Sequence, residues 1–352
     1  MKYLIWLLLI VLIIFRVITT KPMYRDGQYI RLSSTTTSDS LRYGDKQRVS
    51  LNGLKVYLPV FPEIRYGDRV VVEGLVKGGE LKNAKLIKQE YGNNLLLSFK
   101  RKIISFWQKT LPEPHASLVA GIVLGSKSSI PQDFWNDLKK TGTTHVVVAS
   151  GMNVTFVAGF LISGLTLFLK RRWAVFVSIS GIAIYSFMAG LEAPIVRAAI
   201  MASVMLIAQA LGRLTETLRI FFLTALVMLM VNPFWISDLG FLLSFASTLS
   251  LILFGTKVHT KLSFVPGIFR EGLSTSIAAQ VGVAPILFFA FGQFNIFSPV
   301  VNMLVLWIIP LVMVIGSIGG LIGLIFPLLG ELITYLLYPL TSWFIYVVNI
   351  FS

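Results

Sequence analysis

The chain has 352 residues, of which 55% are hydrophobic and 13% charged, against about 25% charged in ordinary soluble domains. With a mean hydropathy of +0.78, this composition excludes a disordered protein, a secreted disulfide scaffold and a cytosolic enzyme with one core; it leaves a polytopic membrane protein. The net charge of +15 is concentrated in residues 1–110, with 19 basic and 8 acidic residues, whereas residues 111–352 have 12 and 8. The absence of cysteine excludes disulfides, thiolate metal sites and a cysteine nucleophile.

The N-terminus begins with a short hydrophobic span, residues 3–18, which follows Lys2. A cleaved signal peptide is the competing interpretation. However, Arg16 interrupts the end of the apolar run and no small-residue cleavage site follows it. We therefore predict an uncleaved signal-anchor transmembrane helix over residues 1–21.

Residues 22–92 have the short apolar runs and frequent turns of a small β domain. We predict five strands, over residues 28–36, 46–51, 54–58, 69–76 and 81–88. Gly44-Asp45 and Gly67-Asp68 each place a turn just before a strand. The second strand of this kind resembles the Gly-Asp-x-Val-x-Val-x-Gly strand of many OB-folds, so the domain is predicted to be OB-like.

Residues 93–141 are predicted to hold an amphipathic helix, over 94–110, and a connecting segment. The helix has two interpretations. In the first it lies at the membrane interface, where Trp107 reaches headgroup depth and Lys100, Arg101 and Lys102 supply charge. In the second it is a linker helix packed on its neighbours. Nearby, the glycines of 121–128 lack the spacing of a P-loop, so ATP binding is not predicted.

Residues 142–352 form a succession of apolar spans, each of a length suited to about 30 Å of hydrocarbon. The predicted spans are 144–169, 173–190, 194–211, 218–232, 238–255, 273–291, 298–325 and 328–350, with 218–232 marginal. Together with the anchor, the fold class is a polytopic α-helical membrane protein of about eight or nine spans with a small extracytoplasmic all-β domain.

Lysine and arginine set the orientation of these spans. Every second connection is basic (170–172, 213–219 and 257–270), and the intervening ones contain no Lys or Arg (190–193, 232–237 and 292–297). By the positive-inside rule the basic connections are cytoplasmic. It follows that Met1 lies inside, whereas the β domain and the C-terminus lie outside the cytoplasm.

Polar residues inside the spans mark either a substrate path or helix packing. Arg197 is the most costly of them, and we expect it to pair with Glu192, to reach the outer interface, or to lie at a pore mouth. Gln280 and Asn302 are further polar residues within spans, and glycines and prolines interrupt the later ones. The glycine and proline signal is weak because both residues are frequent in membrane helices.

Residues 141–153 combine polar residues with an apolar run. A hydrolase with Ser150 as nucleophile and His145 as base lacks an acid to orient the histidine, and the three histidines lack metal-site spacing. We therefore predict no catalytic residue, no metal and no cofactor.

Four motifs in this order resemble the ComEC family of competence DNA-internalisation channels. They are Leu124-Gly125 with Phe134 and the run from Thr141 to Asn153; Ala193-Pro194-Ile195-Val196-Arg197-Ala198; Asn232-Pro233 with Gly240-Phe241-Leu242-Leu243-Ser244-Phe245; and Gln280, Pro285, Phe291 and Asn302. The β domain occupies the position of the family's extracytoplasmic OB domain. Asn153 departs from the histidine of many members.

The resemblance implies a channel for single-stranded DNA in the cytoplasmic membrane. Its path residues would be His145, Ser150, Gly151, Asn153, Arg197, Gln280 and Asn302. Basic and aromatic residues suited to stacking and phosphate contact in the β domain are Tyr43, Arg48, Tyr57, Arg65 and Arg69. A small-molecule or ion transporter with an accessory OB-like module is the alternative class.

The resemblance also bears on partners. Many members continue into a metallo-β-lactamase-like domain, for which this sequence, ending at Ser352, shows no histidine motif. We therefore expect single-stranded DNA, membrane lipid, a DNA receptor, a cytoplasmic translocation ATPase and a separate nuclease as partners, and oligomers are compatible with the sequence.

Overall fold

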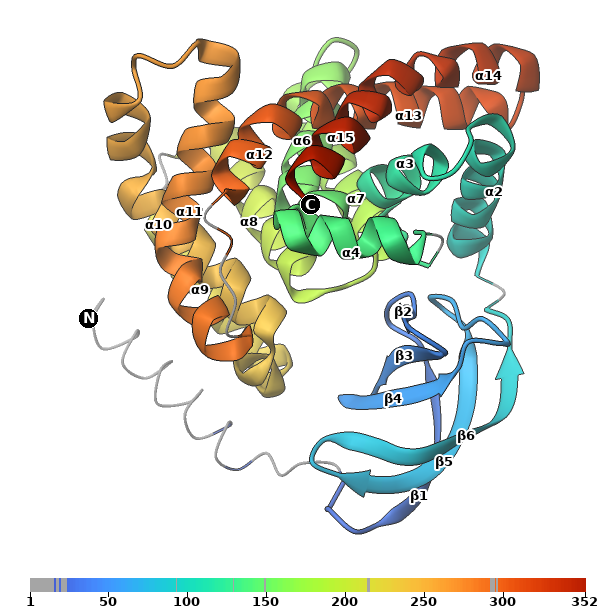
Figure 1. Cartoon of the computed structure of the whole chain (residues 1–352). Helices are drawn as coiled ribbons and strands as arrows, with labels where there is room; N and C mark the ends of the chain where they lie inside the picture. The colour runs from blue at the N-terminus through green and yellow to red at the C-terminus, as the bar shows by residue number, and fades with distance from the viewer. Residues whose placement is uncertain are drawn as a thin grey trace.

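The protein consists of a β domain and a larger helical region, shown in a computed structural model (Figure 1). The structure describes residues 16, 19, 24–92, 94–128, 130–148, 150–213, 216–291, 295 and 297–352. The predicted signal anchor lies outside the described residues, apart from Arg16 and Thr19.

Six strands form one mixed sheet in the order β1-β5-β6-β4-β3-β2. They are β1 (Tyr29–Thr35), β2 (Leu41–Tyr43), β3 (Lys46–Leu51), β4 (Leu54–Pro59), β5 (Arg69–Lys77) and β6 (Glu80–Glu90). Neighbouring strands are antiparallel except β4 and β6. The five predicted strands are all present; β2 is the addition, and its three residues are too few to show an alternating pattern.

Alternation of side chains builds the core of this domain. Val49 and Leu51 on β3, and Val70 and Val72 on β5, point inward and are buried, while the residues between them are at least partly exposed. The predicted turns also form, because Gly44 and Gly67 adopt φ of +57° and +87° just before β3 and β5.

The helical region is built from helices of 4 to 25 residues joined by short connections. In chain order they are α2 (Leu95–Thr110), α3 (His115–Leu124), α4 (Gln132–Thr141), α5 (Thr144–Val147), α6 (Gly151–Leu165), α7 (Arg171–Ala189), α8 (Ala193–Ala210), α9 (Thr217–Val231), α10 (Leu239–Lys261), α11 (Gly267–Phe291), α12 (Ser298–Val305), α13 (Ile309–Gly323), α14 (Pro327–Tyr335) and α15 (Leu337–Phe351). Gly125 and Gly142 end α3 and α4 in the left-handed conformation, so two glycines of the first motif act as helix stops.

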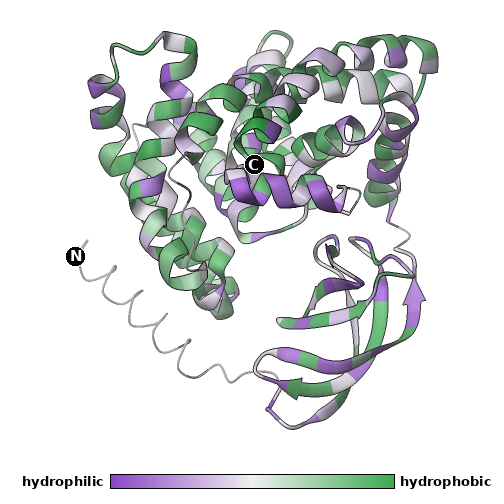
Figure 2. Ribbon diagram, viewed as in Figure 1, coloured by the Kyte–Doolittle hydropathy of each residue, from purple (hydrophilic) through white to green (hydrophobic). Residues whose placement is uncertain are grey.

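Seven segments of the described chain are long and apolar enough to cross a membrane, which confirms a polytopic membrane protein. They are Thr144–Leu165, Arg171–Ala189, Ala193–Ala210, Leu239–Lys261, Gly267–Ala290, Ser298–Gly323 and Pro327–Phe351. The predicted span 218–232 corresponds to the shorter α9, of 15 residues. In Figure 2 the helices of this region are coloured mainly as hydrophobic residues, with α4 as a hydrophilic exception.

The β domain contacts one end of the helical region. The Tyr66 and Phe187 rings lie 6.1 Å apart between their centroids, and the Asp39 carboxylate accepts the Lys127 backbone N–H at 3.3 Å. Lys127 in turn forms an ion pair of 2.5 Å with Glu192, in the connection between α7 and α8. The basic connections α6–α7 and α10–α11 lie at the opposite end (Figure 1).

Candidate functional site

Arg197 lies at the meeting point of three helices. Pro194 occupies the first turn of α8, which fits its fixed φ and missing N–H, and places Arg197 one turn further on. The Arg197 Nε donates to the Ser244 hydroxyl of α10 at 2.7 Å, and its guanidinium carbon lies 6.0 Å from the centroid of the Phe245 ring. The Arg197 side chain is half-buried. Because a guanidinium stays charged, the helical region holds a positive charge at this point.

Glycine allows α6 to approach this cation. A Cβ on Gly151, the first residue of α6, would lie 2.8 Å from Arg197 Nη2 and 3.2 Å from the Ala198 Cβ. On the other side, a Cβ on Gly240 of α10 would lie 3.8 Å from Pro194. Three sequence motifs that are far apart in the chain therefore converge on one guanidinium.

The expected pairing of Arg197 with Glu192 is wrong. Glu192 pairs with Lys127, which the connection after α3 brings to it. Throughout the part of the chain that the structure describes, no carboxylate oxygen lies within 4.0 Å of the Arg197 nitrogens. Arg197 is instead surrounded by a hydroxyl, the Met201 thioether at 3.5 Å and an aromatic ring. Its charge is thus not neutralised by a described acidic residue.

Ser150 and Asn153 hold the break between α5 and α6. Asn153 is fully buried, and its amide nitrogen donates to the Ile122 carbonyl of α3 at 2.8 Å. The Ser150 hydroxyl donates to the Asn153 amide oxygen at 3.2 Å. Asn153 therefore ties the start of α6 to α3, next to the Gly151–Arg197 contact.

His145 and Asn302 belong to a second polar group. The His145 Nδ1 donates to the Gly142 carbonyl at 2.9 Å, and a Cβ on Gly142 would lie 2.9 Å from the Ser298 hydroxyl. Ser298 and Ser276 both accept from the buried Asn302 amide, at 3.4 and 2.7 Å. Within the described residues no hydrogen bond joins this group to Arg197, and His145 and Ser150 bond to different partners.

Gln280 lies one turn beyond Ser276 on the same face of α11, since residues four apart share a helix face. Sequence reasoning missed Ser244, Ser276 and Ser298 as partners of the path residues. The signal for Ser244 was its place as a polar residue inside an apolar span, within the Leu243-Ser244-Phe245 part of a motif.

The predicted helix over 94–110 is present as α2, and its residues divide between the two interpretations. Trp107 is 0% exposed and Lys100 is 5% exposed, because this face packs on neighbouring elements. Arg101 donates to the Gly92 carbonyl at 2.7 Å, and Lys102 is exposed. The burial of Trp107 and Lys100 favours a linker helix on that face, whereas Lys102 faces outward.

In the β domain, Arg48 and Tyr57 lie directly opposite each other on β3 and β4. Arg69 pairs across β5 and β6 with Glu90, and Tyr43 ends β2 opposite Lys46. The Arg65 guanidinium forms an ion pair of 2.7 Å with Glu63, which raises the pKa of Arg65. Of the five candidates, Arg48 and Tyr57 are therefore the pair that strand register places side by side.

Fold and site together define a multi-pass helical membrane protein with a β domain at one end and a half-buried cation among its spans. The sequence model of a family described as Competence protein matches residues 122–352. The chain therefore belongs to the competence protein family.

Among curated proteins, the chain is 28% identical over 231 residues to ComE operon protein 3 of Bacillus subtilis, covering 64% of this chain and 29% of that protein. It is 26% identical over 250 residues to the uncharacterized protein YcaI of Escherichia coli, covering 67% and 32%. The chain thus spans about a third of the length of these two relatives. No solved structure matches it.

Proposed function

We propose that this chain forms a channel through which single-stranded DNA crosses the cytoplasmic membrane during natural transformation. Membership in the competence family supports a role in DNA uptake. The observation that carries the channel proposal is Arg197, a cation among membrane helices with no described carboxylate partner, on which three motifs converge.

A nucleic acid strand needs a compensating positive charge where it leaves water, because its phosphates lose their hydration. Arginine suits this role since its planar guanidinium can donate two hydrogen bonds to one phosphate and stays charged. In this proposal Ser244 orients the Arg197 guanidinium, and Gly151 leaves space beside it. His145, Gln280 and Asn302 would line a separate part of the path.

The β domain would capture the strand before it enters the membrane. The single parallel pair, β4 with β6, in an otherwise antiparallel sheet supports an OB-like barrel. Arg48 and Tyr57 lie side by side and offer a phosphate contact and a stacking ring. Arg65 and Arg69 would extend this surface, and Tyr43 is kept as a candidate from the sequence.

The position of the β domain supports an extracytoplasmic location. It contacts the connection around Glu192, which has no Lys or Arg, and lies at the end opposite the basic connections (Figure 1). A DNA receptor would then deliver DNA on the outside. A translocation ATPase inside and a separate nuclease would complete the system.

The proposal is tested by DNA uptake in cells whose own copy is replaced by variants of Arg197. Arg197→Gln should lower uptake at least about tenfold, because a charge-assisted contact to phosphate is lost, whereas Arg197→Lys should retain part of it. Uptake is measured as internalised labelled DNA, normalised to the amount of protein in the membrane.

Arg213→Gln is the matched control, because it removes one positive charge from an exposed connection after α8. It should leave uptake within about twofold of the wild type, as expected for an exposed surface charge. Normal uptake by Arg197→Gln at equal expression would contradict the proposed role of Arg197 in the DNA path.

A further inference from the structure

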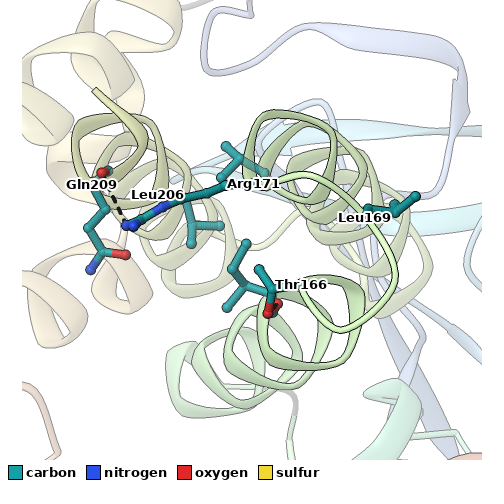
Figure 3. Close-up of a pocket in the computed structure, with 7 residues that line it drawn as sticks. Thr166, Leu169, Arg171, Leu206 and Gln209 are labelled. Carbon is teal, nitrogen blue, oxygen red and sulfur yellow. Dashed lines mark hydrogen bonds between the residues drawn. The ribbon is translucent and has the colours of Figure 1, made fainter. Parts of the chain in front are cut away.

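A pocket of about 320 Å³ opens between the ends of α6, α7 and α8 (Figure 3). It lies at the end of the helical region away from the β domain (Figure 1). Its wall is aliphatic, made by Ile162, Leu169, Val175 and Leu206. Its polar groups are Thr166, Arg171 and Gln209. An apolar wall with one cation at the edge is suited to an amphiphile that carries a negative charge.

Arg171 is held in place across this pocket. Its Nη2 donates to the Gln209 carbonyl of α8 at 3.1 Å, so the side chain extends from α7 to α8, as Figure 3 shows. A guanidinium has five N–H donors, and this contact uses one of its nitrogens. Donors therefore remain for an anionic oxygen at the pocket.

The chain segment around Arg171 carries charge of one sign. Lys170 and Arg172 flank Arg171, and the sequence contains no Asp or Glu between Asp137 and Glu192. Among the ion pairs between described residues, none involves Arg171. Of these three cations, Arg171 lines the pocket, and Lys170 and Arg172 stand next to it in the chain.

Exposed apolar side chains place the pocket at the membrane surface. Leu167, Phe168 and Trp173 are 78%, 86% and 64% exposed, and they stand beside the three cations. Large apolar and aromatic residues next to Lys and Arg mark the level of lipid headgroups. These residues would bring the mouth of the pocket to the level of the lipid phosphates.

We propose that this pocket binds an anionic phospholipid, with the headgroup phosphate at Arg171 and the start of an acyl chain along Leu206 and Ile162. The volume is at the small end for ligand sites, which suits a headgroup and glycerol rather than a whole lipid. Basic pockets between membrane helices recognise such headgroups elsewhere. This proposal is independent of the transported substrate.

The test uses the full chain in a zwitterionic detergent, titrated with dioctanoyl phosphatidylglycerol or with phosphatidylcholine of the same chains. Native mass spectrometry counts the bound lipids. The wild type should bind phosphatidylglycerol preferentially. Arg171→Gln should weaken that binding about five- to tenfold. Arg172→Gln is the control, because Arg172 is adjacent but does not line the pocket; its affinity should stay within about twofold of the wild type.

Two further experiments test whether the acyl chains and the space in the pocket are needed for binding. Glycerol phosphate, which lacks acyl chains, should not compete, since the apolar wall would be left empty. Thr166→Phe fills the pocket without changing the charge and should also weaken lipid binding. Equal losses in Arg171→Gln and Arg172→Gln, or equal affinity for phosphatidylcholine, would overturn the proposal; Arg171 would then serve to bond the last carbonyls of α8.

Discussion

Lys100 is a cation buried at the junction of the β domain and the helices. Its ammonium lies 3.9 Å from the Asp39 carboxylate and 5.6 Å from the centroid of the Tyr66 ring, and Lys127 and Glu192 are the other charges nearby. Burial lowers the pKa of Lys100, and the charge of Asp39 offsets part of that effect. Lys100 therefore loses its proton at a lower pH than an exposed lysine would.

This pKa shift gives stability a dependence on pH. As pH rises through the lowered pKa towards the usual 10.5, the folded chain releases the proton while the unfolded chain keeps it. Stability from this group therefore increases with pH. We expect the melting temperature of the wild type, minus that of Lys100→Met, to rise between pH 7 and pH 10.

The comparison is measured by thermal unfolding of the full chain in detergent. The raised pKa of Tyr66, caused mainly by burial, is present in both proteins and largely cancels in the difference. Lys102→Met, on the exposed face of the same helix, should show no such trend. A difference that stays flat with pH would mean that Lys100 is not buried as the structure places it.

At this scale the sequence singled out candidate residues but did not predict their partners. Arg197 was a candidate because a charge in an apolar span is costly, and its role was left open between pairing, the outer interface and a pore mouth. Its expected partner, Glu192, was the nearest acid in the sequence, but Lys127 reaches it from 65 positions away. Ser244 is 47 positions from Arg197, a separation across which single-sequence patterns carry no contact information.

Among the elements, α13 shows how glycines let membrane helices approach. Cβ atoms on Gly316 and Gly320 would lie 3.0 Å from Val123 of α3 and 2.9 Å from Trp107 of α2. These glycines are buried against neighbouring helices. They therefore serve helix packing and not a substrate path, the other interpretation of glycine in such spans.

Gly320→Ala should destabilise the helical region by about 1–3 kcal/mol, because the new methyl group would overlap Ile103 and Trp107, both at 2.9 Å. Gly159→Ala is the control, since its Cβ on α6 would meet no atom within 4 Å. This second change should be neutral or stabilising, by up to about 1 kcal/mol. Denaturation of both variants in mixed detergent micelles measures the difference, and equal stabilities would contradict the close α2–α13 contact.

Periodicity and length predicted the elements well where the pattern is long. Strands β3–β6 and the long spans follow from alternation or from apolar length. The break at Ser150, which separates α5 from α6, was not predicted within the span 144–169, because it depends on the bonds of Asn153 to another helix. Likewise, burial of Trp107 depends on glycines more than 200 residues later.

For the whole molecule, the central expectation is the topology: the β domain lies outside the cytoplasm and the basic connections lie inside. The chain contains no cysteine, so a single introduced cysteine gives an unambiguous label. Lys88→Cys on the β domain should react with a membrane-impermeant maleimide in intact spheroplasts. Lys261→Cys, at the end of α10, should react only after permeabilisation. The opposite result would invert the topology.

The contacts at the junction also connect the β domain to Arg197. Asp39 of the β domain holds the Lys127 backbone, Lys127 holds Glu192, and Glu192 precedes Arg197 by five residues, about 7.5 Å of helical rise. A pull on the β domain would therefore reach the guanidinium through one hydrogen bond, one ion pair and less than two turns of α8. If the β domain captures a polymer, as proposed, tension on that polymer would act on the position of Arg197 through this short chain of contacts.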